Sequence, residues 1–298
     1  MLSEKTIKLA LILLAILGFS NLTNNVWAAD KARVKTITVT VKQKQQTNLP
    51  ELGRDDFIVM EDGSKQEVIS VVPATSTQAP LNLALVIEDG LQVNNEIPAL
   101  KSFMRELPAG SQVMIAYLNG NFVEERQSFT TDLALAASRL RIVNSFSRSF
   151  TSPYLQLIEI MKQFNGFNQG RNEILFISKG TFGSAVSDIH LSRAIKVAQQ
   201  ENITIFSLYA PPASGRRFFT GQNGLYDLSE ETGGEAFFMG TGFVTFDAPL
   251  TKFNQLLNQQ YLISYKSTNE SDDLHRVKVS TDYSNIKVRV LKNYRSKS

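Results

Sequence analysis

Two consecutive carboxylates, Glu88 and Asp89, follow an apolar run that covers residues 81–87 and ends before Gly90. A run of this kind predicts a strand that is buried on both faces, as in the centre of a parallel sheet. In open α/β sheets, ligands bind in the crevice beyond the carboxyl ends of such strands. We therefore expect Glu88, Asp89, Gly90 and Gln92 to line a functional site, if the chain has one.

Other residue types that carry chemistry are few. The two histidines, His190 and His275, lie far apart, and no G-x-S-x-G segment offers a nucleophile on a sharp turn. The chain has no cysteine, which excludes thiol catalysis and Cys-ligated metal centres. No glycine-rich phosphate loop follows the run at 81–87. These residues predict a protein that is not an enzyme and in which both histidines have surface or structural roles.

A basic and aromatic loop follows a further strand, predicted at 203–209. It covers residues 214–220 and contains Arg216, Arg217, Phe218 and Phe219. Arginine and aromatic residues are enriched among the residues that dominate protein–protein binding. If a protein partner binds the crevice, we expect this loop to contact it. The alternative is a solvated loop whose phenylalanines pack on the domain.

Residues 1–28 have the layout of a secretory signal peptide, in which Lys5 and Lys8 precede an apolar stretch at 9–19 and Ala28 offers a cleavage site. The apolar stretch is about half of the ~20 residues that cross a bilayer, so an uncleaved anchor is the alternative. No later segment is long and apolar enough to span a membrane, which favours a periplasmic or secreted protein. The net charge of +3 is too small to favour nucleic acid as a partner.

The pattern of the chain changes twice along its length. Residues 29–74 read as β-strands and include the hairpin signal Asp62-Gly63, and 75–80 form a linker. Residues 81–258 alternate between strands and helices, which predicts an α/β fold with a doubly wound, mostly parallel sheet. Residues 259–298 return to β. We expect the two ends to form one small flanking β domain, with two separate sheets as the alternative.

Several stretches, in this order, resemble exported bacterial proteins with a domain related to the von Willebrand factor type A (VWA) domain. The resemblance covers about residues 34–292 and implies a protein-binding fold. The stretches that carry it are FIVMEDG at 57–63, LVIEDG at 85–90, FTSPYL at 150–155, ILFISKG at 174–180 and EETGGEAFF at 230–238.

The resemblance also implies a metal-ion-dependent adhesion site, in which a D-x-S-x-S loop, a threonine and an aspartate bind a divalent cation. Here the acidic position is Glu88, the two serine positions hold Gly90 and Gln92, the threonine is Thr151, and the aspartate is replaced by Lys179. Divalent cations prefer oxygen ligands and are repelled by an ammonium group. The site is therefore degenerate, and we expect no metal and no other cofactor.

Lys179 leads to the central hypothesis. Its ammonium group would replace the cation and pair with Glu88 or Asp89; the alternative is a solvated lysine. The function expected is an exported, non-catalytic protein-interaction module that binds its partner without a divalent metal. The alternative is an adhesin or assembly factor that keeps a weak metal site through Glu88, Asp89 and Thr151.

Overall fold

The computed structural model describes residues 33–43, 51–120, 122–144, 151–167, 169–181, 184–214, 219–237, 245–271 and 273–294. The predicted signal peptide at 1–28 lies outside the described residues. Among the described residues, no helix has the length and apolar character needed to cross a membrane.

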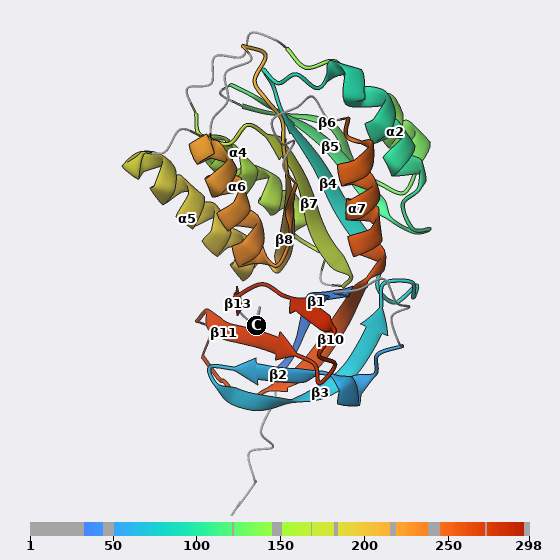
Figure 1. Cartoon of the computed structure of the whole chain (residues 1–298), viewed down its shortest axis with the longest axis vertical. Coiled ribbons are helices and arrows are strands. Elements are labelled where there is room, and N and C mark those ends of the chain that lie inside the picture. Colours follow the sequence, from blue (N-terminus) through green and yellow to red (C-terminus); the bar gives the residue numbers. More distant parts are fainter. Residues whose placement is uncertain are drawn as a thin grey trace, which may run out of the picture. The chain divides into compact units, whose positions relative to one another are not determined.

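The α/β part contains a six-stranded mixed sheet with the order β6-β5-β4-β7-β8-β9 (Figure 1). β4 pairs in parallel with β5 and with β7, and only the edge strand β6 runs antiparallel. The predicted α/β class is therefore confirmed. The strands are β4 (Leu81–Glu88), β5 (Gln112–Asn119), β6 (Phe122–Thr130), β7 (Arg171–Ser178), β8 (Ile203–Tyr209) and β9 (Ala236–Phe237).

Helices cover both faces of this sheet, which explains why β4 is apolar at nearly every position. Leu83 and Leu85 belong to a core with α2, α3 and α7, whereas Ala84 and Val86 belong to a core with α4, α5 and α6. Figure 1 shows α2 and α7 on one side of the sheet and α4, α5 and α6 on the other. The helices are α2 (Ile97–Arg105), α3 (Leu133–Ser138), α4 (Pro153–Met161), α5 (Ala185–Gln200), α6 (Phe219–Thr232) and α7 (Asp247–Asn258), with short 3₁₀ turns at Arg54–Asp56, Asn94–Glu96 and Lys162–Phe164.

A second sheet joins strands from both ends of the described chain, in the order β12-β1-β10-β3-β2-β11-β13. Neighbouring strands that pair in it run antiparallel. The early and late segments thus pair with each other within one sheet instead of forming two. The strands are β1 (Arg33–Gln43), β2 (Ile58–Glu61), β3 (Ser64–Pro73), β10 (Gln260–Ser267), β11 (His275–Ser280), β12 (Ile286–Arg289) and β13 (Asn293–Tyr294).

The turn between β2 and β3 confirms the hairpin predicted from Asp62-Gly63. Asp62 has φ +49° and Gly63 has φ +85°, the positive angles that a two-residue hairpin turn requires. The turn places Glu61 on the inner face of the sheet, where it is fully buried, and Asp62 at its rim. The inner face also carries an apolar cluster that includes Ile37, Val59 and Ile263.

Candidate functional site

Glu88 is the last residue of β4, and the end of the neighbouring strand β7 holds its carboxylate. Because side chains alternate along a strand, Glu88 points to the same side as Ala84 and Val86, toward α4, α5 and α6. Ser178, the last residue of β7, donates its hydroxyl hydrogen to Glu88 Oε2 at 2.7 Å. The backbone amide of Lys179 donates to the same oxygen at 3.3 Å. Glu88 is consequently a satisfied carboxylate with an exposed fraction of 4%.

Lys179 follows β7 and brings its ammonium group to the second oxygen of Glu88, Oε1, as an ion pair. The Lys179 side chain is 23% exposed, so the pair is only partly enclosed. Burial lowers the pKa of Lys179 to about 8, which leaves the amine largely protonated at neutral pH. Gly180, at φ +68°, lies so close to the backbone of Gly221 in α6 that a Cβ would overlap it. This close approach fixes the path of the loop that carries Lys179.

Asp89 points to the opposite face of the sheet, toward the segment after α3. Arg141 donates to it with both terminal nitrogens, Nη1 to Oδ1 and Nη2 to Oδ2, each at 2.9 Å, and the Asn144 amide donates to Oδ1 at 3.0 Å. The same guanidinium pairs with Glu124 of β6 at 2.6 Å and lies 3.9 Å from the ring centre of Tyr117. The bond from Arg141 holds the pKa of Glu124 below its usual range. Both oxygens of Asp89 are therefore occupied.

The other expected site positions contribute backbone and amide groups. Gly90 adopts φ +79° and accepts a bond from the amide of Ala213 at 2.7 Å. Gln92 donates its side-chain amide to the Ala213 carbonyl at 3.3 Å. Thr151 lies two residues before α4, which starts at Pro153. Hydrogen bonds thus join the segment after β4 to the segment after β8. The two serine positions of a metal loop, Gly90 and Gln92, carry no hydroxyl group.

The donor set does not fit a divalent cation. Such ions take about six or more oxygen ligands, but the oxygens of Glu88 and Asp89 face opposite sides and are already bonded. An ammonium ~4 Å from a divalent cation would be repelled by about 8 kcal/mol at an effective dielectric constant of ~20. Within the described residues, no group of three or more His, Cys, Asp or Glu side chains is arranged to hold a metal.

The basic and aromatic loop expected at 214–220 is only partly described. Phe219 is the first residue of α6, so the expectation that the loop continues to residue 220 is wrong. Arg216, Arg217 and Phe218 lie outside the described residues, and their role as a partner contact stays a prediction. The segment before them packs on the crevice, where Leu91 and Pro212 form a β-bridge.

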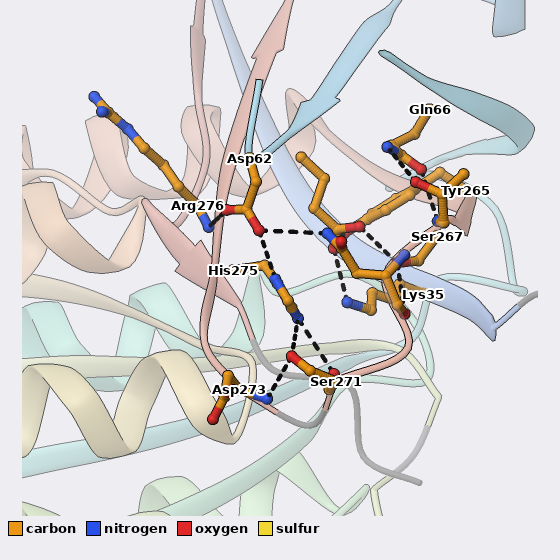
Figure 2. A network of polar contacts seen from close by, with 12 residues as sticks. Lys35, Asp62, Gln66, Tyr265, Ser267, Ser271, Asp273, His275 and Arg276 are labelled. Atoms are coloured by element: carbon orange, nitrogen blue, oxygen red, sulfur yellow. Dashed lines mark hydrogen bonds and ion pairs between the residues drawn. The ribbon is translucent and has the colours of Figure 1, made fainter. Parts of the chain in front are cut away.

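A second polar cluster, which sequence reasoning missed, lies in the seven-stranded sheet (Figure 2). Lys35 Nζ lies 2.7 Å from Glu61 Oε1, and both side chains are fully buried. Tyr265 and Ser267 donate hydroxyl hydrogens to the Glu61 oxygens at 3.1 and 2.5 Å. Burial alone would raise the pKa of Glu61, but the bonds from Lys35 and Ser267 lower it below its usual value. The charges in this cluster compensate one another.

Beside that pair, the fold brings His275 between an aspartate and a serine. His275 Nδ1 lies 2.7 Å from Asp62 Oδ2, and Nε2 lies 3.2 Å from Ser271 Oγ. These distances match the reach of a nucleophile–base–acid arrangement, which no motif in the sequence indicates. However, Nε2 is also 3.2 Å from the Ser271 carbonyl, and the Asp273 amide donates to Ser271 Oγ at 3.4 Å. The bonds tie the loop before β11 to the β2–β3 turn.

No protein-family model matches the sequence, and no curated protein matches it. Solved structures with similar folds include a von Willebrand factor type A protein from Catenulispora acidiphila, at 11% identity and a TM-score of 0.48, covering 84% of this chain and 75% of that one. The vWF domain of the type V pili tip protein Mfa5 from Porphyromonas gingivalis is 11% identical, with a TM-score of 0.47, and covers 61% of this chain and 96% of that chain. BatB from Bacteroides thetaiotaomicron is 15% identical, with a TM-score of 0.47, and covers 60% of this chain and 97% of that chain. At these identities and TM-scores, the similarities carry no conclusion about function.

Proposed function

We propose that this chain is an exported, non-catalytic protein-interaction module that binds its partner at the crevice without a divalent metal. The observation that carries the proposal is the ion pair between Lys179 and Glu88 at the ends of β7 and β4. The bidentate bond from Arg141 to Asp89 supports it, because it removes the second acid that a cation could use.

The exposed side of Lys179 suggests how a partner would bind. An ammonium group carries three N–H donors, and Glu88 is the one acidic group that pairs with Lys179 among the described residues. A partner carboxylate that approaches from solvent would meet the remaining donors. The amine would then do electrostatically what a bound cation does in a metal-dependent adhesion site. Arg216 and Arg217 would add contacts at the rim.

The proposal extends to the layout and location of the chain. Residues 1–28 would serve as a signal peptide, 29–74 and 259–298 as a flanking β domain, and 81–258 as a VWA-like, doubly wound domain after the linker at 75–80. Export would place the mature protein in the periplasm or outside the cell. The α/β sheet and the strand order of the second sheet support this layout.

Partner capture tests the proposal. The mature chain, immobilised, would recover its partner from the producing organism equally well with EDTA and with added Mg²⁺. Lys179→Ala would lose the partner, whereas the exposed-lysine control Lys196→Ala would keep it. The paired change Arg216→Ala and Arg217→Ala would reduce recovery if the loop contributes. Recovery that EDTA abolishes would contradict the proposal and favour the alternative, a metal-dependent adhesin or assembly factor.

A further inference from the structure

A groove beside the seven-stranded sheet has no role in the function proposed above. It lies between β11 and β12, has a volume of about 680 Å³, and is lined by both strands, by the β2–β3 hairpin and by Glu230 of α6. A volume of this size is within the range of specific binding pockets. The groove uses none of the crevice residues.

Both strands turn an incompletely paired edge toward this groove. β12 pairs with β1 on one side, and β11 pairs with β2 on one side. On its other side, β11 pairs with β13 only through His275 and Arg276, and a last bond joins the Val277 amide to the Lys292 carbonyl at 3.0 Å. Residues 278–280 extend beyond that ladder. Because amides alternate along a strand, the Val279 amide points to the groove side, as the Val277 amide does.

The groove combines apolar walls with positive charge. Val277 and Val279 are buried and belong to the core of the sheet, and Val288 and Val290 pack against the same core. Of the five cations that line the groove, Arg289 pairs with Glu230 and Lys292 pairs with Glu231.

The other three cations, Arg276, Lys278 and Lys287, are exposed, and no ion pair is found for their side chains among the described residues. In Figure 2 the Arg276 side chain extends away from the Asp62–His275 cluster. Three exposed cations along two strand edges, with no ion-pair partner among the described residues, complement a ligand that is negatively charged at short intervals.

We propose that this groove binds an extended peptide segment of a partner protein, in which acidic residues alternate with apolar ones. Incompletely paired strand edges bind extended chains through backbone hydrogen bonds, and alternate side chains then face opposite sides. The acidic side chains would pair with Arg276, Lys278 and Lys287, and the apolar ones would contact the partly exposed Val288 and Val290. The surface is independent of the crevice, and its occupant needs no metal.

A designed peptide tests this inference directly. The probe is a fluorescein-labelled hexapeptide of alternating glutamate and valine, with a lysine–valine peptide as its charge-reversed counterpart. We expect the whole chain from residue 29 to bind the glutamate–valine peptide in an anisotropy titration and not the lysine–valine peptide. Raising NaCl from about 0.15 to about 1 M would weaken binding, because exposed ion pairs are screened.

Two matched triple variants locate the site. The groove variant Arg276→Gln, Lys278→Gln and Lys287→Gln would bind the peptide roughly tenfold more weakly, because three screened ion pairs act together. The control variant Arg105→Gln, Arg139→Gln and Lys196→Gln removes three exposed cations in α2, just after α3 and in α5, and would bind as the wild type does. Bound peptide would also slow hydrogen exchange of the Val279 amide.

Three outcomes would overturn the inference. One is equal affinity of the groove variant and the wild type. Another is binding of decanoate in the groove without binding of the peptide, which would indicate a site for a small amphipathic anion. The last is peptide binding that appears only as the chain dimerises. The crevice variant Lys179→Ala would bind the peptide normally. Failure of the groove proposal can therefore be told apart from failure of the proposed function at the crevice.

Discussion

Lysine–glutamate ion pairs occur in both sheets of this molecule, Lys35–Glu61 in the seven-stranded sheet and Lys179–Glu88 at the crevice. Lys35 and Glu61 are fully buried, and two hydroxyl groups satisfy the remaining acceptor capacity of Glu61. Lys179 is 23% exposed and reaches its carboxylate from a loop. The same chemistry therefore occurs in two settings: one pair is sealed inside a sheet, whereas the pair at the strand end is partly exposed, as the proposed partner site requires.

The largest effect is expected when the enclosed pair is broken. Lys35→Met leaves the charge of Glu61 buried without its cation, and we expect a loss of about 3–5 kcal/mol in the free energy of unfolding. Urea denaturation measures this loss. The exposed control Lys65→Met would change stability little, and the double change Lys35→Met with Glu61→Leu would recover much of the loss. A loss below about 1 kcal/mol would contradict the structural role of the pair.

A buried acid without a lysine sharpens the comparison. Glu173 of β7 is fully buried, and burial raises its pKa to about 7, although the nearby charge of Arg171 and the amide of Gln260 lower it. Because the folded pKa of Glu173 lies above the unfolded value, its protonated form favours the folded state. This contribution to stability is fully present below about pH 4.5 and is lost as the pH rises through about 7.

We therefore expect Glu173→Gln to stabilise the chain at pH 8 by on the order of 2–3 kcal/mol, and to have little effect at pH 4. Thermal unfolding at both pH values measures the difference, with the exposed Glu67→Gln as the control. Equal effects of Glu173→Gln at the two pH values would show that Glu173 does not titrate in this range.

The crevice pair should matter less for stability and more for binding. Lys179→Ala leaves Glu88 bonded to Ser178 and to a backbone amide, so we expect a loss of only about 1–2 kcal/mol. Partner binding would fall as the pH rises through about 8, because the amine then loses its proton. Binding measured from pH 6 to pH 10 checks this, and a pH-independent affinity would remove Lys179 from the interface.

The smallest effect is expected at the rim of the second sheet. The hydrogen bond from His275 lowers the pKa of Asp62, but the Asp62 side chain is 46% exposed and its charge is screened. Asp62→Asn should cost about 0–1 kcal/mol at neutral pH. The contribution of the Asp62 charge to stability is present above the unfolded pKa of Asp62 and is lost as the pH falls through its lowered folded pKa. Labelling of Ser271 by a fluorophosphonate would contradict the loop-fixing role of His275.

The apolar runs of β4 and β7, the alternation after residue 81 and the Asp62-Gly63 turn were predictable because they follow from local patterning. The partner of Asp89 was not, because Arg141 lies 52 residues away and carries no motif. The burial of Lys35 was equally hidden, since an alternating strand gives no sign that one polar position faces inward with a distant Glu61. Pairings between distant polar residues depend on the tertiary fold, and periodicity does not encode them.

Isothermal titration calorimetry of the mature chain with Mg²⁺, Mn²⁺ and Ca²⁺ tests the central claim most directly, with Glu88→Ala as the matched variant. An amine that occupies the place of the cation predicts no saturable heat for any of the three ions, in the wild type or in the variant. Micromolar binding that Glu88→Ala abolishes would contradict it.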